Sequence, residues 1–244
     1  GTFSPRLARA SLAGAAVLFV ATCHSEKGTG PCVANVLAFV ASPTPTAGVA
    51  FSVTVQARDN SGNVVSCFTS NVTISLGTNP GGATLSGTTT QPASSGVATF
   101  FDLKIDKSGA GYTLSAIASG LTGSATNGFT VVAGAVDHLA FSVQPTGATA
   151  ATTIAPPVQV TAQDLGGNTV TSFTGNVTVA ITSGTGTPGA ALTGTTAATV
   201  ANGHVNNGVA TFNDLKVNLA GGNYKLTATS GTVTAATSAP FTIS

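Results

Sequence analysis

The sequence has 244 residues, of which 42% are hydrophobic and only 6% are charged. Disordered chains usually combine low hydrophobicity with high charge, so this composition predicts a folded protein. Eight lysines and arginines stand against seven aspartates and glutamates, which leaves no basic face for phosphates, and we expect no nucleic-acid partner.

The amino-terminal residues have the pattern of a secretory signal. Arg6 and Arg9 precede the apolar run Ala10–Ala21. This run is shorter than the roughly 20 residues that cross a bilayer, and a basic region followed by a short apolar region is typical of a signal peptide. We therefore interpret residues 1–22 as a signal peptide and the polar, turn-rich residues 23–35 as a flexible tether.

The end of this run, Val20-Ala-Thr-Cys23, resembles the lipobox of bacterial lipoproteins. The resemblance implies cleavage before Cys23 and acylation of that residue, although Thr22 stands where the family usually has Gly, Ala or Ser. It further implies a membrane partner through the lipid anchor, and a location in the cell envelope at the outer membrane or cell surface. A plain signal peptide and a retained hydrophobic helix are the alternatives.

Short strands separated by turn residues follow the tether. Val36–Ala41 ends at the prolines of Ser42-Pro-Thr-Pro45, and Phe51–Ala57 alternates so that Phe51, Val53, Val55 and Ala57 share one face. Asp59-Asn-Ser-Gly62 supplies a tight turn. Regularly spaced short strands of this kind indicate an antiparallel sandwich. Further strands are predicted at residues 64–68, 71–76, 83–85, 96–105, 112–118 and 129–132.

The chain then repeats itself. Residues 53–74 and 158–179 both contain Asp-x-x-Gly-Asn followed by Phe-Thr-x-Asn-Val-Thr, which reads as strand, turn and strand in duplicate. Each copy lies in a segment of about 100 residues, a common domain size. We predict an all-β fold of two tandem sandwich domains, at residues 36–134 and 135–244.

A tyrosine in each copy makes the prediction more specific. Tyr112-Thr-Leu114 and Tyr224-Lys-Leu226 have the spacing of the tyrosine corner of immunoglobulin domains, with leucine in the place of the second cysteine. The alternative is an ordinary half-buried aromatic residue in a strand. With leucine at this position, the core has to be held by apolar burial instead of an inter-sheet disulfide.

Residues 36–244 resemble the tandem immunoglobulin-like (Big-type) repeats of exported bacterial proteins. Three duplicated motifs carry the resemblance: Phe-Thr-x-Asn-Val-Thr, Leu-Ser/Thr-Gly-Thr-Thr and Gly-Val-Ala-Thr-Phe. It implies a non-enzymatic stalk or adhesion module with no catalytic residues and no cofactor. A carbohydrate-binding module that uses the loop at residues 183–207, and a filament subunit that assembles by edge-strand addition, are the alternatives. A protein or polysaccharide ligand stays unidentified.

The cysteines leave a choice open. Three cysteines are an odd number for an exported chain, and acylation of Cys23 would leave Cys32 and Cys67 as a candidate disulfide. The second copy has Ser172 in place of Cys67, so the fold itself does not require a thiol there. The distance between the two α-carbons decides whether they pair.

The scattered polar residues have simpler interpretations than a site. Asp59 and Asp164 have no second acid beside them, so turn stabilisation is favoured over calcium binding. Asp102 and Asp214 precede Leu-Lys, which favours a solvent-facing pair with lysine across neighbouring strands. We expect no metal site, because the candidate ligands lie far apart in the sequence. These ligands are His24, His138 and His204. Glu26 is the only glutamate and lies in the tether, so we do not expect the paired carboxylates of a glycosidase either.

Overall fold

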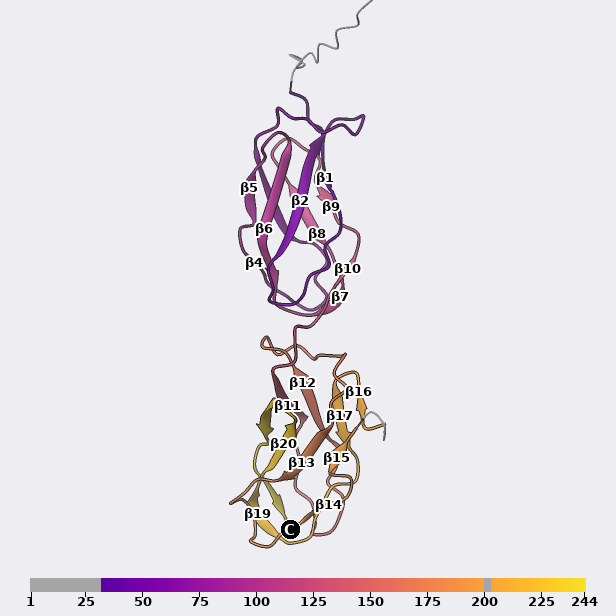
Figure 1. Cartoon of the computed structure of the whole chain (residues 1–244), viewed down its shortest axis with the longest axis vertical. Helices are drawn as coiled ribbons and strands as arrows, with labels where there is room; N and C mark the ends of the chain where they lie inside the picture. The colour runs from indigo at the N-terminus through magenta and orange to yellow at the C-terminus, as the bar shows by residue number, and fades with distance from the viewer. Residues whose placement is uncertain (1–31, 200–202) are drawn as a thin grey trace, which may run out of the picture. The chain divides into compact units, whose positions relative to one another are not determined.

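The structure, a computed structural model, describes residues 32–199 and 203–244 (Figure 1). Every regular element in these two ranges is a β-strand, and no helix there is long and apolar enough to cross a membrane. Buried side chains form two separate hydrophobic cores, one from Leu37 to Val131 and one from Leu139 to Ile243. The predicted all-β fold of two immunoglobulin-like sandwiches is confirmed.

The first sandwich consists of two four-stranded antiparallel sheets. One sheet has the order β1-β2-β6-β4, and the other has the order β5-β3-β8-β9. A small ladder of β10 and β7 completes this half of the chain. The strand bounds are β1 Val36–Phe39, β2 Phe51–Arg58, β3 Asn71–Leu76, β4 Leu85–Ser86, β5 Thr90–Pro92, β6 Val97–Ile105, β7 Gly109–Tyr112, β8 Leu114–Ile117, β9 Ser124–Ala125 and β10 Phe129–Val131.

Alternation along β2 and β6 builds the first core. Val53, Val55 and Ala57 of β2 are buried, and Ala98 and Phe100 lie opposite Val55 and Val53 on β6. The predicted apolar face of β2 is therefore confirmed. Its fourth residue, Phe51, is partly buried and packs against the core. Fully burying an aliphatic or aromatic side chain stabilises a fold by about 1.5–3 kcal/mol, so these strands hold the sheet against the opposite layer.

The second sandwich has the same plan with one continuous sheet. Its order is β15-β13-β20-β21-β11-β12-β17-β16, in which β11 pairs in parallel with β21 and so joins the two layers. Two short ladders, β14 with β18 and β19 with β22, lie beside it. The strand bounds are β11 His138–Val143, β12 Val158–Gln163, β13 Val177–Ile181, β14 Leu192–Thr193, β15 Ala197–Ala198, β16 Val205–Asn206, β17 Val209–Phe212, β18 Lys216–Val217, β19 Gly221–Tyr224, β20 Leu226–Ser230, β21 Val233–Thr237 and β22 Phe241–Ile243.

Two predicted strands of the first sandwich were wrong in detail. Residues 64–68 form a single antiparallel bridge of Val64 with Arg58, in which the Val65 amide donates to the Ala57 carbonyl, and then turn, with the Phe68 amide donating to the Val65 carbonyl. The Phe68 ring at the end of this segment is buried in the core. The strand predicted at residues 112–118 is two strands, since the chain leaves β7, which pairs with β10, and joins β8, which pairs with β3.

The two tyrosines at equivalent positions differ in their hydrogen bonds. Tyr224 and Tyr112 are both fully buried, and each packs near a phenylalanine ring. The Tyr224 hydroxyl donates to the Leu219 carbonyl over 2.8 Å, which confirms the tyrosine corner in the second sandwich. Within residues 32–199 and 203–244 the Tyr112 hydroxyl makes no well-formed hydrogen bond, although it lies against the backbone of Gly81. Burial, followed by the charge of Asp106, raises the pKa of Tyr112.

This difference predicts opposite outcomes for one substitution. We expect Tyr224→Phe to lower the free energy of unfolding of the second sandwich by about 1 kcal/mol, because the substitution removes the hydrogen bond from the buried hydroxyl to the Leu219 carbonyl. Tyr112→Phe is expected to leave the stability of the first sandwich unchanged or to raise it, because the substitution removes a buried hydroxyl that makes no well-formed hydrogen bond. Urea unfolding of the two variants compares the effects, and equal losses in both would contradict the assignment.

Candidate functional site

The Asp-x-x-Gly-Asn turn of the first sandwich is a self-contained structure. One carboxylate oxygen of Asp59 accepts hydrogen bonds from the backbone amides of Ser61 and Asn63, each at 2.9 Å. The other oxygen accepts from the Asn63 side-chain amide at 3.2 Å. The bonds from Asn63, its backbone amide first, hold the pKa of Asp59 below its usual value. The interpretation of Asp59 as a turn-stabilising residue is confirmed.

The equivalent turn of the second sandwich makes these bonds and adds a further one. Oδ1 of Asp164 accepts from the backbone amides of Gly166 and Asn168, as the turn requires. Its Oδ2 accepts from the Gly134 amide at 2.8 Å, in the segment between the two cores. Burial alone raises the pKa of Asp164, but the bonds from Gly134, Asn168 and Gly166 outweigh it and hold that pKa below its usual value. Here too the prediction of a turn-stabilising aspartate is confirmed.

Asn168 extends this network to a loop of the first half of the chain. Its side-chain amide donates to the Asp106 carbonyl over 3.0 Å, and its side-chain oxygen accepts from the Ser108 amide over 3.0 Å. Asn168 is buried, whereas its counterpart Asn63 is exposed. The sequence showed that the asparagine recurs with its turn, but nothing in the pattern indicated that the second copy binds another loop.

A hollow of about 500 Å³ lies beside the Asp164 turn. Its walls are mostly apolar and include Val49, Val136 and Leu165, with Asp106 and Asp137 at the margin. Both oxygens of Asp164 are already hydrogen-bonded. Within residues 32–199 and 203–244, no three His, Cys, Asp or Glu side chains come together in a way that could hold a metal ion.

Asp102 and Asp214 bind threonine, and the predicted pairing with lysine was wrong. Asp102 accepts from the Thr88 backbone amide at 2.9 Å and from its hydroxyl at 2.8 Å. Asp214 accepts from the same two groups of Thr195, at 2.8 and 3.1 Å. No salt bridge joins either aspartate to a lysine in the described part of the chain. These bonds from threonine, the backbone amide first, lower the pKa of both carboxyl groups.

The threonine and the aspartate belong to two motifs that the sequence showed separately. Thr88 and Thr195 follow the glycine of Leu-Ser/Thr-Gly-Thr-Thr, and Asp102 and Asp214 follow the Gly-Val-Ala-Thr-Phe strand. The strand pairs β4–β6 and β14–β18 bring the two motifs together in each sandwich. Both motifs recur because they form one structural contact in each sandwich.

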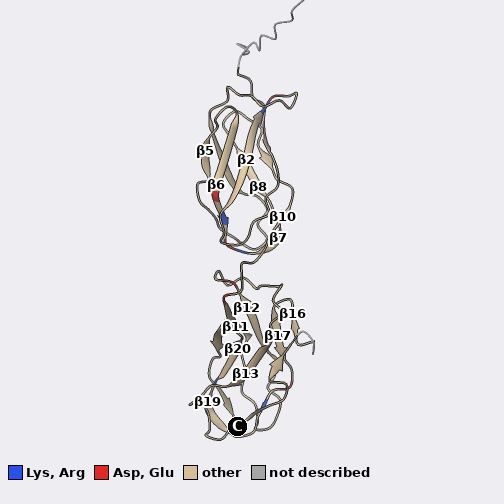
Figure 2. Ribbon diagram, viewed as in Figure 1, with Lys and Arg blue, Asp and Glu red and all other residues tan. Residues whose placement is uncertain are grey.

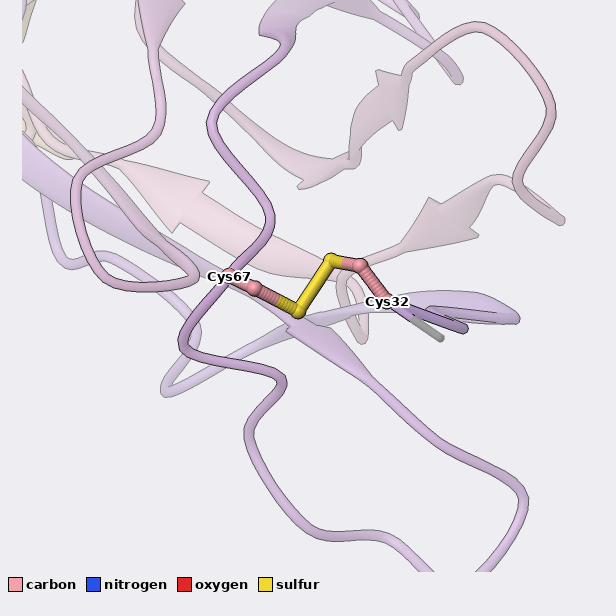
Figure 3. The surroundings of a disulfide bond; sticks show 2 residues. All are labelled: Cys32 and Cys67. Atoms are coloured by element: carbon pink, nitrogen blue, oxygen red, sulfur yellow. A yellow bond between two sulfur atoms is a disulfide. The ribbon is translucent and has the colours of Figure 1, made fainter. Parts of the chain in front are cut away.

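A disulfide joins Cys32 to Cys67, with the α-carbons 5.8 Å apart (Figure 3). Cys32 lies just before β1, and Cys67 lies in the turn segment between β2 and β3. The bridge therefore closes a loop that contains both β1 and β2. Both cysteines are exposed. The second sandwich has Ser172 at the position of Cys67, so this cross-link belongs to the first sandwich alone.

The remaining candidate residues do not converge. His138 contacts the Asp137 carboxylate at 3.0 Å and the Gln163 side chain at 3.2 Å, whereas His204 contacts the Thr211 carbonyl at 2.8 Å. Figure 2 shows the charged residues as a few separate positions on an otherwise uncharged chain. The lipidation candidate Cys23, together with the signal peptide, His24 and Glu26, lies outside the described residues.

No family model and no curated protein matches the chain. Among solved structures, it is similar to the Escherichia coli adhesin FdeC (20% identity, TM-score 0.44, covering 88% of this chain and 65% of that one). It is also similar to domains 4–9 of the surface layer protein SbsC (22% identity, TM-score 0.31, covering 86% and 31%). A third similarity is to a β-glycosidase from Bacteroides vulgatus (10% identity, TM-score 0.33, covering 86% and 25%).

The chain thus spans less than two thirds of the length of each of these three solved chains. With TM-scores below 0.5, these similarities support no argument about this chain. The assignment of the fold rests on its own sheets and cores.

Proposed function

We propose that the chain is an exported, lipid-anchored protein of the cell envelope, at the outer membrane or cell surface. Its two sandwiches serve as a structural stalk or adhesion module, and no residue acts as a catalyst. This proposal rests mainly on one observation, which is that the polar residues repeated in both copies stabilise the backbone of the fold. Each of the four duplicated aspartates accepts hydrogen bonds from backbone amides of the fold. These residues are Asp59, Asp102, Asp164 and Asp214.

Export and anchoring are supported by two features at the start of the chain. The basic and apolar order of residues 1–22 is that of a signal peptide, and Cys23 stands where a bacterial lipoprotein carries its acyl chains. The Cys32–Cys67 disulfide fits an exported protein, because disulfides persist in oxidising compartments and are rare in the cytosol.

Replacing Cys23 with alanine tests the anchor. We expect Cys23→Ala to lose metabolic labelling by a fatty acid and to move from the membrane fraction to the soluble fraction, since the acylated group is absent. Thr29→Ala is the matched control, because it changes a residue just downstream and leaves both the lipobox-like residues and the Cys32–Cys67 bridge intact. Retained labelling and unchanged membrane fractionation of Cys23→Ala would contradict the proposal.

The two alternative functions have less support. Pockets for small ligands are commonly lined by hydrophobic and aromatic side chains, and the hollow of about 380 Å³ at residues 181–190 has no aromatic residue in its lining. Strand addition needs a free edge of some length. The edge strands β4 and β5 of the first sandwich are short, and β5 contains Pro92, which donates no ladder bond. Binding of the chain to a glycan array would support the carbohydrate-binding module. Concentration-dependent association in light scattering would support the filament subunit.

A further inference from the structure

We propose that the Cys32–Cys67 disulfide sets the path of mechanical tension through the first sandwich. A pull that arrives from the residues before Cys32 passes through the bridge to Cys67 and bypasses β1 and β2. The inference rests on the proposed function for its setting, because an anchored stalk is pulled from its amino-terminal side. The route that the tension takes depends only on where the bridge lies in the fold.

Without the bridge, tension would enter the sandwich through β1. This strand pairs antiparallel with β2, from Val36 opposite Arg58 to Phe39 opposite Val55. The next segment then runs parallel to the end of the sandwich: the Ala47 amide donates to the Val132 carbonyl over 2.8 Å. Because the chain leaves this sandwich just after Val132, a pull on both ends would load these hydrogen bonds directly.

With the bridge, residues 33–66 form a covalently closed loop. β1, β2 and Ala47 lie inside this loop and away from the direct path, whereas Val132 lies outside it, where the chain leaves the sandwich. Tension enters instead at Cys67, next to the buried Phe68 and just before β3. A disulfide is a covalent bond and outlasts the hydrogen bonds of a sheet, so the loop stays closed even when the rest of the sandwich has unfolded.

The closed loop limits how far the first sandwich extends. The two cysteines are separated by 35 residues, and at roughly 3.4 Å per extended residue the loop withholds about 120 Å of chain. The second sandwich, with Ser172 in place of the cysteine, has no such limit. Its own parallel contact, in which the Ser244 amide donates to the Ala148 carbonyl over 2.9 Å, is exposed to the pull.

Single-molecule force spectroscopy tests this path on the full chain, with handles at Gly1 and Ser244. A Cys23→Ser background removes the third thiol, so that it cannot exchange with the bridge. We expect two unfolding steps, one for each sandwich. Dithiothreitol supplies the two electrons and two protons that convert the bridge to two thiols, and is itself oxidised to a cyclic disulfide. Reduction is expected to lengthen one step by about 120 Å and leave the other unchanged.

Two variants make the result specific. Cys67→Ser is expected to lengthen the same step without any reductant, and Ser172→Ala, its counterpart in the second sandwich, is expected to change neither step. Should Cys67→Ser fail to fold, reduction of the folded parent protein still gives the comparison. Two steps of unchanged length after reduction would overturn the inference, as would free thiols at Cys32 and Cys67 in unreduced protein. Acylation of Cys23 does not enter these measurements, so their outcome is separate from that of the anchoring test.

Discussion

Replacing Cys67 with serine is expected to lower the free energy of unfolding of the first sandwich by about 4 kcal/mol. The bridge spans 35 residues and restrains the unfolded chain, which regains the entropy of that loop when the bridge is lost. The folded state loses little, because Cys67 is exposed and lies in a turn outside the sheets. The loss is large beside the total stability of a domain, which is commonly about 5–15 kcal/mol.

Urea unfolding of the full chain under oxidising conditions measures this effect. The second sandwich provides the control, since Ser172→Ala changes the equivalent turn position without touching a cross-link and is expected to cost less than about 0.5 kcal/mol. The transition of the first sandwich should move to lower urea in Cys67→Ser, and the transition of the second should stay in place. An unchanged first transition would mean that the bridge does not restrain the unfolded chain.

Much of the fold was predictable because its determinants are local. The period-two alternation of Val53, Val55 and Ala57 identified the buried face of β2, and the turn at Asp59 followed from the preferences of aspartate and glycine. Because the sequence is duplicated, each predicted element could be compared with its counterpart in the other copy. Residues that recurred, such as Asp164, belonged to the fold, and this comparison correctly removed them from the list of candidate sites.

Local patterns could not show which distant segments meet. Asp102 lies close to Lys104 in the sequence, and this nearby opposite charge suggested a lysine as its partner. The pairing of β4 with β6 instead brings Thr88 to Asp102. The contacts of Asn168 with Ser108 cross an even longer separation. Recurrence was nevertheless a usable signal for the first of these contacts, since the threonine and aspartate motifs recur together in both copies.

The cysteine pair marks another limit of the sequence. Whether Cys32 and Cys67 pair depends on the distance between their α-carbons, and that distance is set by how residues 33–66 fold back on themselves. Comparison of the copies argued against the pair, because Ser172 shows that the fold does not need it. The cross-link is therefore specific to the first sandwich, the one that follows the segment we propose as the tether.

The glycine of the Leu-Ser/Thr-Gly-Thr-Thr motif has the second large effect that we predict. Gly194 has a φ of +97°, and a Cβ atom at this position would lie 2.3 Å from the Asp214 carbonyl oxygen. Its counterpart Gly87 has a φ of +98° and the same 2.3 Å approach to Asp102. The close approach is what allows the following threonine to bind the aspartate. Alanine has to separate the two segments, and the obstacle is backbone, which cannot rotate away.

We expect Gly194→Ala to lower the free energy of unfolding of the second sandwich by about 3 kcal/mol or more, from left-handed strain and steric overlap together. Gly189→Ala is the matched control: Gly189 has a φ of +81°, but its Cβ would meet nothing within 4 Å. That variant should cost only about 1–2 kcal/mol, the strain of the backbone alone. Urea unfolding of both variants separates the two contributions. Equal losses would mean that the motif requires glycine only for its backbone conformation, and that its contact with Asp214 adds no constraint.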